Sequence, residues 1–213
     1  MKRLFVSLSI IVLLYACSKS DSESPRSEPV YTENFSEGEG TGFWTGSRVK
    51  DSFTAAIQDG FYQVTNKGSQ LHTFSINPVF IVDTGNVALE TKVAASPLDG
   101  NGLCYAGLIW GVNHDNGQVF IFGYLPKGYF NVLGAPKGGE FKVYKGNTPS
   151  PAIKKAGFNR LRIERKNGSL HFLINGTEVF KMATQTSSLD RPGFIVDKKT
   201  KAQFDYFKAS ALP

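Results

Sequence analysis

The sequence predicts an all-β fold, an antiparallel sandwich of two sheets, and three observations support it. After Val30, short apolar runs alternate with polar residues, which is the period of a β-strand. Two Asn-Gly pairs, Asn167-Gly168 and Asn175-Gly176, lie between such runs, and Asn-Gly favours tight hairpin turns. The chain has 22 Gly and 17 Phe in 213 residues, a composition typical of strands and turns.

The clearest strand covers 159–166, where apolar and charged residues alternate. With strands at 170–174 and 177–180 it predicts an antiparallel meander joined by the two Asn-Gly turns. The segment 151–158 is too short for a stable helix, so we expect at most a turn there. About a dozen short strands without helices predict a sandwich or a barrel. Further strands are expected at 30–35, 61–65, 70–76, 87–95, 103–111, 118–124, 128–133, 139–144, 192–196 and 203–210.

The N-terminus has the three-part layout of a secretory signal: a basic start, an apolar run over 4–14 and a small residue before Cys17. The apolar run is too short to span a membrane comfortably. The segment 14–17, Leu-Tyr-Ala-Cys, resembles the bacterial lipobox. This resemblance implies a signal peptide over 1–16, cleavage before Cys17 and acylation of that cysteine. The alternative is an ordinary signal peptide that ends in Cys.

Residues 17–29 follow as a polar segment without apolar side chains other than proline. Such a segment buries too little surface to offset the entropy of ordering, so we expect a flexible tether. The folded domain is expected over 30–213. Several acyl chains anchor a protein stably, which predicts an exported lipoprotein of the cell envelope. The outer membrane is the expected location, on its periplasmic or its exposed side.

The charge of the chain is modest and dispersed. Without Lys2 and Arg3 the formal net charge falls from +6 to +4. The densest basic run is only Lys198, Lys199 and Lys201. Because nucleic-acid binding needs a concentrated basic face, we expect no nucleic-acid partner.

Several motifs occur in an order typical of one superfamily: Asp59–Val64, Tyr105–Gly111, Asn159–Arg165, Phe172–Gly176, Gly193–Val196 and Phe204–Phe207. Through them the chain resembles the concanavalin-A-like lectin/glucanase superfamily, in its laminin-G-like branch, over about residues 30–211. The resemblance implies two antiparallel sheets in jelly-roll topology, with the first strand near the last. The superfamily includes lectins, carbohydrate-binding modules, glycosidases and protein-binding modules, so it leaves the function open.

No catalytic residue is predicted. Glycosidases need two carboxylates about 5 to 9 Å apart, and on this fold they typically present them from one strand as Glu-x-Asp-x-x-Glu. The chain contains no Glu-x-Asp. The strand acids Glu90 and Glu164 are expected to face outward, and a carboxylate pair assembled across strands is the alternative. We expect Cys104, in an apolar run, to be a buried and unreactive thiol.

Segment 105–131 mixes aromatic rings with amides and acids, the composition of sugar-binding sites. No cofactor is expected. Asp99-Gly-Asn-Gly102 begins like a calcium-binding loop. An EF-hand is excluded, because position twelve of that loop would be Trp110 instead of the required Glu. A structural calcium of another kind is left open. The candidate ligand-binding residues are Trp110, Asn113, His114, Asp115, Asn116, Tyr124 and Tyr129.

The first functional hypothesis is a lipid-anchored, non-catalytic glycan-binding protein of the cell envelope, with a polysaccharide or oligosaccharide as its partner. The membrane contact is expected through the lipid anchor only. A protein-binding or structural envelope module is the second hypothesis. A sugar-active enzyme with an unrecognised carboxylate pair is the third.

Overall fold

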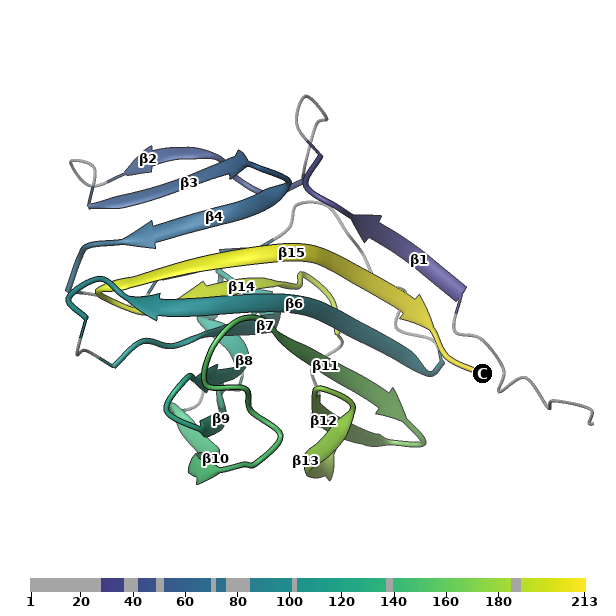
Figure 1. Ribbon diagram of the computed structural model, residues 1–213. Coiled ribbons are helices and arrows are strands. Elements are labelled where there is room, and N and C mark those ends of the chain that lie inside the picture. The colour runs from purple at the N-terminus through teal and green to yellow at the C-terminus, as the bar shows by residue number, and fades with distance from the viewer. Residues whose placement is uncertain are drawn as a thin grey trace, which may run out of the picture.

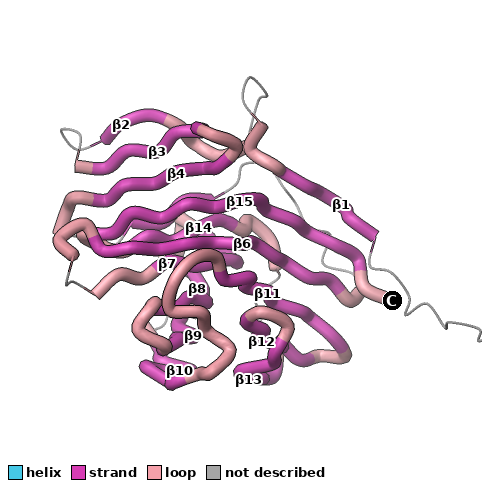
Figure 2. Tube along the Cα trace, in the orientation of Figure 1, coloured by secondary structure: helices cyan, strands magenta, loops and turns pink. Residues whose placement is uncertain are grey.

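The computed structural model describes residues 28–36, 42–48, 52–69, 72–75, 85–100, 103–136, 140–184 and 189–213. Every regular element in these ranges is a β-strand, as predicted (Figure 2). The same ranges hold no helix long and apolar enough to cross a membrane. The predicted signal peptide and most of the predicted tether lie outside the described residues, and the first strand begins at Glu28.

The strands form two antiparallel sheets, which confirms the predicted sandwich (Figure 1). Sheet A has the strand order β13-β12-β11-β6-β15-β4-β3-β2. Its ninth strand, β1, lies outside this order and pairs with β15. Sheet B has the order β10-β9-β8-β7-β14-β5. The strands of sheet A are β1 (Glu28–Glu33), β2 (Gly46–Arg48), β3 (Phe53–Gln58), β4 (Phe61–Asn66), β6 (Val87–Pro97), β11 (Asn159–Lys166), β12 (Ser169–Ile174), β13 (Thr177–Ala183) and β15 (Thr200–Ala211). Those of sheet B are β5 (His72–Ser75), β7 (Ala106–Asn113), β8 (Gln118–Leu125), β9 (Tyr129–Ala135), β10 (Lys142–Pro149) and β14 (Gly193–Val196).

The predicted pairing of the first and last strands is confirmed. In the register of β1 and β15, Glu33 lies opposite Phe207 and Thr32 lies opposite Lys208. β15 also pairs along its whole length with β6, and these two long strands form the middle of sheet A (Figure 1). This arrangement brings segments from both ends of the domain into one sheet.

The predicted meander is also confirmed, as β11, β12 and β13 pair in succession. Both residues of each Asn-Gly turn have positive φ: 49° and 72° at Asn167-Gly168, and 52° and 87° at Asn175-Gly176. Positive φ at both central residues is the requirement of a type I′ turn, whose twist matches that of the strands it joins.

The sequence patterns missed β2 and β3. Asp59-Gly60 joins β3 to β4 in a tight hairpin, and both residues have positive φ, 55° and 74°. Asp-Gly before an alternating run is a hairpin signal, and it would have located β3. The strand expected at 139–144 begins at Lys142 and continues to Pro149.

The core between the sheets consists mainly of aromatic rings. Phe194 of sheet B stacks on Phe204 of sheet A with ring centroids 3.8 Å apart, and on Phe43 at 4.6 Å. All three side chains are buried. Stacked rings from both sheets therefore hold the two layers together.

Sheet B has a second apolar side. Because neighbouring residues of a strand point to opposite faces, Leu108 belongs to the main core while Ile109 belongs to a separate cluster. Ile121 and Ile195, also in that cluster, are buried as well. Sheet B therefore has buried apolar side chains on both faces at these positions.

Candidate functional site

The connection from β10 to β11 carries the chain from sheet B to sheet A. We call residues 150–158 the crossover loop. It consists of turns and bends, as the sequence predicted, and contains no helix. Ile153 inserts its side chain into the main core. The Ser150 amide donates to the carbonyl oxygen of Gly128 over 2.9 Å, which fixes the loop to the β8–β9 turn.

Two asparagines, the buried Asn159 and the half-buried Asn175, determine the shape of the crossover loop. The side-chain oxygen of Asn159 accepts a hydrogen bond from the Lys154 amide over 2.8 Å, and its amide nitrogen donates to the Lys154 carbonyl over 2.9 Å. Asn175 donates to the Ala152 carbonyl over 2.7 Å and to Asn159 over 2.8 Å. Asn159 is fully buried. The side-chain amides of the two asparagines thus fix the loop by hydrogen bonds to its backbone, in the way that backbone amides pair between strands.

A hollow lies on each side of the crossover loop. On the sheet B side, two adjoining cavities of about 410 and 490 Å³ share Lys127 and Lys155. We call them together the Tyr129 groove. The Tyr129 side chain is 41% exposed there. The other described lining residues are mostly apolar or small: Pro97, Gly100, Leu103, Cys104, Leu125, Pro126, Gly128, Pro149, Ser150, Pro151 and Ile153.

On the sheet A side lies a smaller cavity of about 260 Å³, the Phe158 pocket. Its described lining residues are Lys92, Lys154, Phe158, Arg160 and Asn175. The Phe158 ring stacks on Phe61 with centroids 5.5 Å apart and planes inclined by 20°. The two hollows together thus carry five cationic side chains, and no carboxylate is among their described lining residues.

The structure removes two of the predicted ligand-binding residues from the candidate site. Trp110 and Tyr124 are buried in the core between the sheets. The Tyr124 hydroxyl donates to the Val93 carbonyl over 3.1 Å and accepts from the Ala95 amide over 3.2 Å. Alternation along a strand shows which residues share a face but not which face is inward, so the sequence alone could not separate these buried rings from the exposed ones.

The other predicted residues are at the surface but do not form one site. Asn113 and Asn116 accept hydrogen bonds from the amides of Asp115 and Gln118, so they shape the β7–β8 turn. Asn113 pairs with Gln118 at one end of β8, whereas Tyr129 pairs with Leu125 at the other. At 3.3 Å per residue the ends of this strand are about 23 Å apart. Of the predicted set, which also includes the exposed His114, only Tyr129 lines a described hollow.

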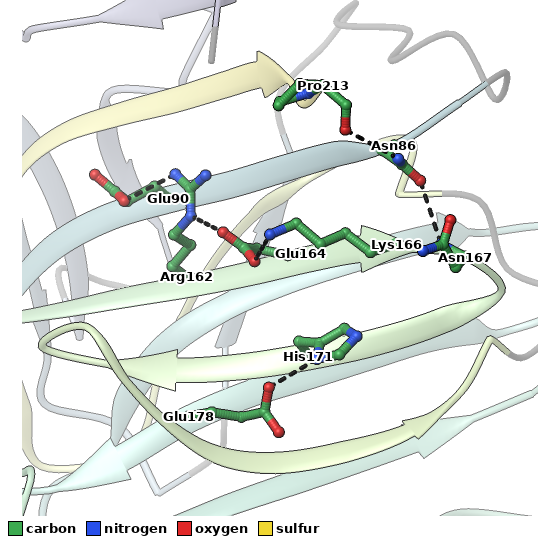
Figure 3. A network of polar contacts seen from close by, with 9 residues as sticks. All are labelled: Asn86, Glu90, Arg162, Glu164, Lys166, Asn167, His171, Glu178 and Pro213. Carbon is green, nitrogen blue, oxygen red and sulfur yellow. Dashed lines mark hydrogen bonds and ion pairs between the residues drawn. The ribbon is translucent and has the colours of Figure 1, made fainter. Parts of the chain in front are cut away.

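Glu90 and Glu164 face outward from sheet A, as predicted, and both bind Arg162 (Figure 3). The Arg162 guanidinium lies 3.0 Å from Glu90 and 2.7 Å from Glu164, and Lys166 lies 2.7 Å from Glu164. Burial alone raises the pKa of Glu164, but hydrogen bonds and charge from Lys166 and Arg162 outweigh it and lower the pKa. A glycosidase acid needs a raised pKa, so this arrangement is that of a structural ion-pair network.

Other reactive groups offer no alternative chemistry in the described residues. Cys104 is buried, as predicted, and burial raises the pKa of its thiol, which keeps it protonated. His171 pairs with Glu178 over 2.7 Å on sheet A. No three His, Cys, Asp or Glu side chains of the described part are close enough to hold a metal ion. The Asp99–Gly102 loop is only partly described, so a structural calcium there stays a prediction.

Comparison with known proteins identifies the fold but no family. No protein-family model and no curated protein sequence matches the chain. Solved structures do: carbohydrate-binding module CBM66 from Bacillus subtilis has a TM-score of 0.59 at 13% identity, covering 80% of this chain and 96% of the module. The Bacillus licheniformis β-glucanase has a TM-score of 0.57 at 10% identity, and the match covers 86% of this chain and 98% of the glucanase. The laminarinase catalytic domain from Thermotoga maritima has a TM-score of 0.58 at 11% identity, and the match covers 88% of this chain and 99% of that domain.

These similarities confirm the predicted fold, a two-sheet antiparallel jelly-roll sandwich. Identities of 10 to 13% establish a shared fold alone. The function must therefore be argued from the residues of the two hollows. Sequence reasoning missed their lysines because Lys127 and Lys155 become neighbours only when the crossover loop packs on the β8–β9 turn. The one local signal was the adjacent pair Lys154-Lys155 between Pro151 and Gly157.

Proposed function

We propose that the chain is a non-catalytic glycan-binding protein that uses the Tyr129 groove. The observation that carries this proposal is the exposed Tyr129 ring in a hollow with apolar walls and two lysines. Aromatic rings stack on the apolar face of a sugar, and flanking polar groups bind its hydroxyls. The fold supports the proposal, since one similar structure is a carbohydrate-binding module.

Catalysis is disfavoured by the groove's own chemistry. Two of the similar structures are a β-glucanase and a laminarinase, so a glycosidase is the natural competitor. Such an enzyme needs two carboxylates facing the bound sugar. The described residues of the Tyr129 groove include none, and Glu90 and Glu164 are neutralised by Arg162 on sheet A.

Tyr129→Ala tests the proposal. We expect the variant to lose affinity about tenfold or more, because a central aromatic anchor contributes about 2 kcal/mol or more to binding and about 1.4 kcal/mol is a tenfold change. Calorimetry of the full-length chain in non-ionic detergent against a panel of polysaccharides is the measurement. Tyr129→Phe should retain most of the affinity. Phe141→Ala, which removes a 54% exposed ring outside the groove, is the matched control.

Absence of binding to every member of a broad polysaccharide panel would reject the glycan-binding function. A single stoichiometric protein recovered from membranes with the wild-type chain, and lost with Tyr129→Ala, would instead establish the protein-binding alternative. Turnover of a glycan abolished by one Asp or Glu substitution would establish the enzyme.

We further propose that the protein is anchored in the cell envelope by acyl chains on Cys17. The support is the leader and lipobox-like segment of the sequence. Cys17→Ser should move the protein from the membrane fraction to the soluble fraction and abolish incorporation of labelled palmitate. Cys104→Ser, the matched control at the other cysteine, should leave both unchanged. Membrane association that persists in Cys17→Ser would reject the anchor.

A further inference from the structure

The Phe158 pocket contains two cations in a position that a sheet normally avoids. Lys92 of β6 and Arg160 of β11 are directly opposite each other in the strand register. Like charges directly opposite in an antiparallel pair destabilise a sheet. Two residues further along, the pair Glu90 and Arg162 has opposite charges and an ion pair of 3.0 Å. The cross-strand partners thus balance each other's charge at one position and not at the position two residues away.

A third cation adds to this excess. Lys154 of the crossover loop lines the same pocket. Asp205 binds Lys92 over 2.5 Å, but Lys154 and Arg160 form no ion pair with any described residue. Three cations therefore surround the pocket with one carboxylate between them. Such a local field attracts an anionic ligand.

The pocket also has an apolar wall and a rigid rim. The Phe158 ring forms the wall, and the Lys92 ammonium lies 5.1 Å from its centroid. Lys154 is fixed through both backbone groups to the buried Asn159, and the Arg160 amide donates to Asn175 over 2.9 Å. These hydrogen bonds fix the backbone that carries the two exposed side chains, so less backbone has to be ordered when a ligand arrives. The pocket thus combines an apolar wall with cations on an anchored rim, which suits a ring that carries a negative group.

We propose that the Phe158 pocket is an anion subsite for acidic glycans. It holds the carboxylate of a uronic acid, or a sulfate, while neighbouring sugars cross the loop into the Tyr129 groove. This inference rests on the proposed function. Lys154 lines the Phe158 pocket and the adjacent Lys155 lines the Tyr129 groove. Positive charge therefore extends across the loop from one hollow to the other. A planar guanidinium such as that of Arg160 binds a carboxylate or sulfate through two hydrogen bonds.

A glycan fits this surface better than a membrane does. The cations line a cavity beside an aromatic wall, which suits a sugar ring. An anionic bilayer presents a broad surface and favours basic residues that project together from one face. The test must therefore distinguish binding of an acidic glycan from binding to an anionic bilayer.

The test compares pairs of probes that share a sugar backbone and differ in charge: oligogalacturonate against its methyl ester, and dextran sulfate against dextran. With the full-length chain in non-ionic detergent, calorimetry should show tenfold or tighter binding of the charged member, and salt should reduce this difference. The double variant Lys154→Gln, Arg160→Gln should lose that advantage and keep its affinity for the neutral member. The control Lys142→Gln, Lys181→Gln removes two exposed lysines that line none of the described hollows.

A melting curve separates a binding role from a structural one. Arg160→Gln removes repulsion with Lys92, so its melting temperature should equal or exceed that of the wild type. A lower melting temperature with unchanged affinity for the charged probes would overturn the inference. Equal affinity for charged and neutral members would overturn it and leave the glycan-binding function standing.

Two further outcomes would also overturn it. Binding to phosphatidylglycerol vesicles that is lost in the double variant, with no binding of the charged oligosaccharides, would assign the cations to a membrane surface. If neither charged nor neutral glycans bind, the proposed function fails together with the inference.

Discussion

Phe194→Ala should destabilise the domain by about 3–5 kcal/mol, the range for removing a large buried aromatic side chain. The ring is fully buried and lies within stacking distance of Phe204 and Phe43, so its removal leaves a cavity where the two sheets meet. In a domain of this size that cost lowers the melting temperature by roughly 10 °C. Urea unfolding followed by tryptophan fluorescence measures the change directly.

A surface aromatic provides the control for Phe194→Ala. Phe141 is 54% exposed, so Phe141→Ala should change stability by no more than about 0.5 kcal/mol. Phe194→Leu, which keeps most of the volume, should fall between the two. Equal stability of Phe194→Ala and Phe141→Ala would show that the stacked rings do not hold the sheets together.

The second large effect is expected at Asn159, which no ligand needs to touch. Asn159→Ala leaves the amide and the carbonyl of Lys154 without partners and removes one of the two hydrogen bonds that the Asn175 amide nitrogen donates. Each buried polar group left unsatisfied costs about 1–3 kcal/mol, so we expect a total loss of roughly 3 kcal/mol. Glycan affinity should fall as well, because the loop that separates the two hollows loses its fixed position.

Hydrogen exchange identifies where Asn159→Ala acts. The amides of Ser150, Ile153 and Lys154 should exchange faster in the variant, while those of β6 and β15 should keep their protection. Asn159→Asp retains the acceptor and should lose less stability. Asn116→Ala removes an amide that shapes the β7–β8 turn and should leave the crossover loop unchanged. Unaltered exchange in the loop of Asn159→Ala would contradict its proposed anchoring role.

The fold was predictable because its signals are local. Alternation marked β11, and two Asn-Gly turns with positive φ fixed the register of the meander. Asp59-Gly60 is also a hairpin signal, and it indicated the strand β3 that the sequence analysis did not predict. Hairpins are determined by a few consecutive residues, so a single sequence suffices to locate them.

The candidate site was less predictable because distant segments form it. Lys92 and Arg160 are 68 positions apart, and their opposition follows from the pairing of β6 with β11. The aromatic-rich segment was recognisable, but alternation cannot tell which of its rings point inward, and Trp110 proved to belong to the core. Tyr129 is exposed because it begins β9 at the end of the sheet, a position that hydrophobic patterning does not encode.

The crossover loop has an evolutionary consequence. Nine consecutive residues, 150–158, separate both hollows and supply a cation to each, while their supports, Asn159 and Asn175, lie outside the loop. Natural variation at the exposed positions of this segment, which exclude the core residue Ile153, can therefore alter what is recognised without disturbing the aromatic layers beneath. Descendants that keep the two asparagines would inherit a stable scaffold and remain free to diversify in their choice of ligand.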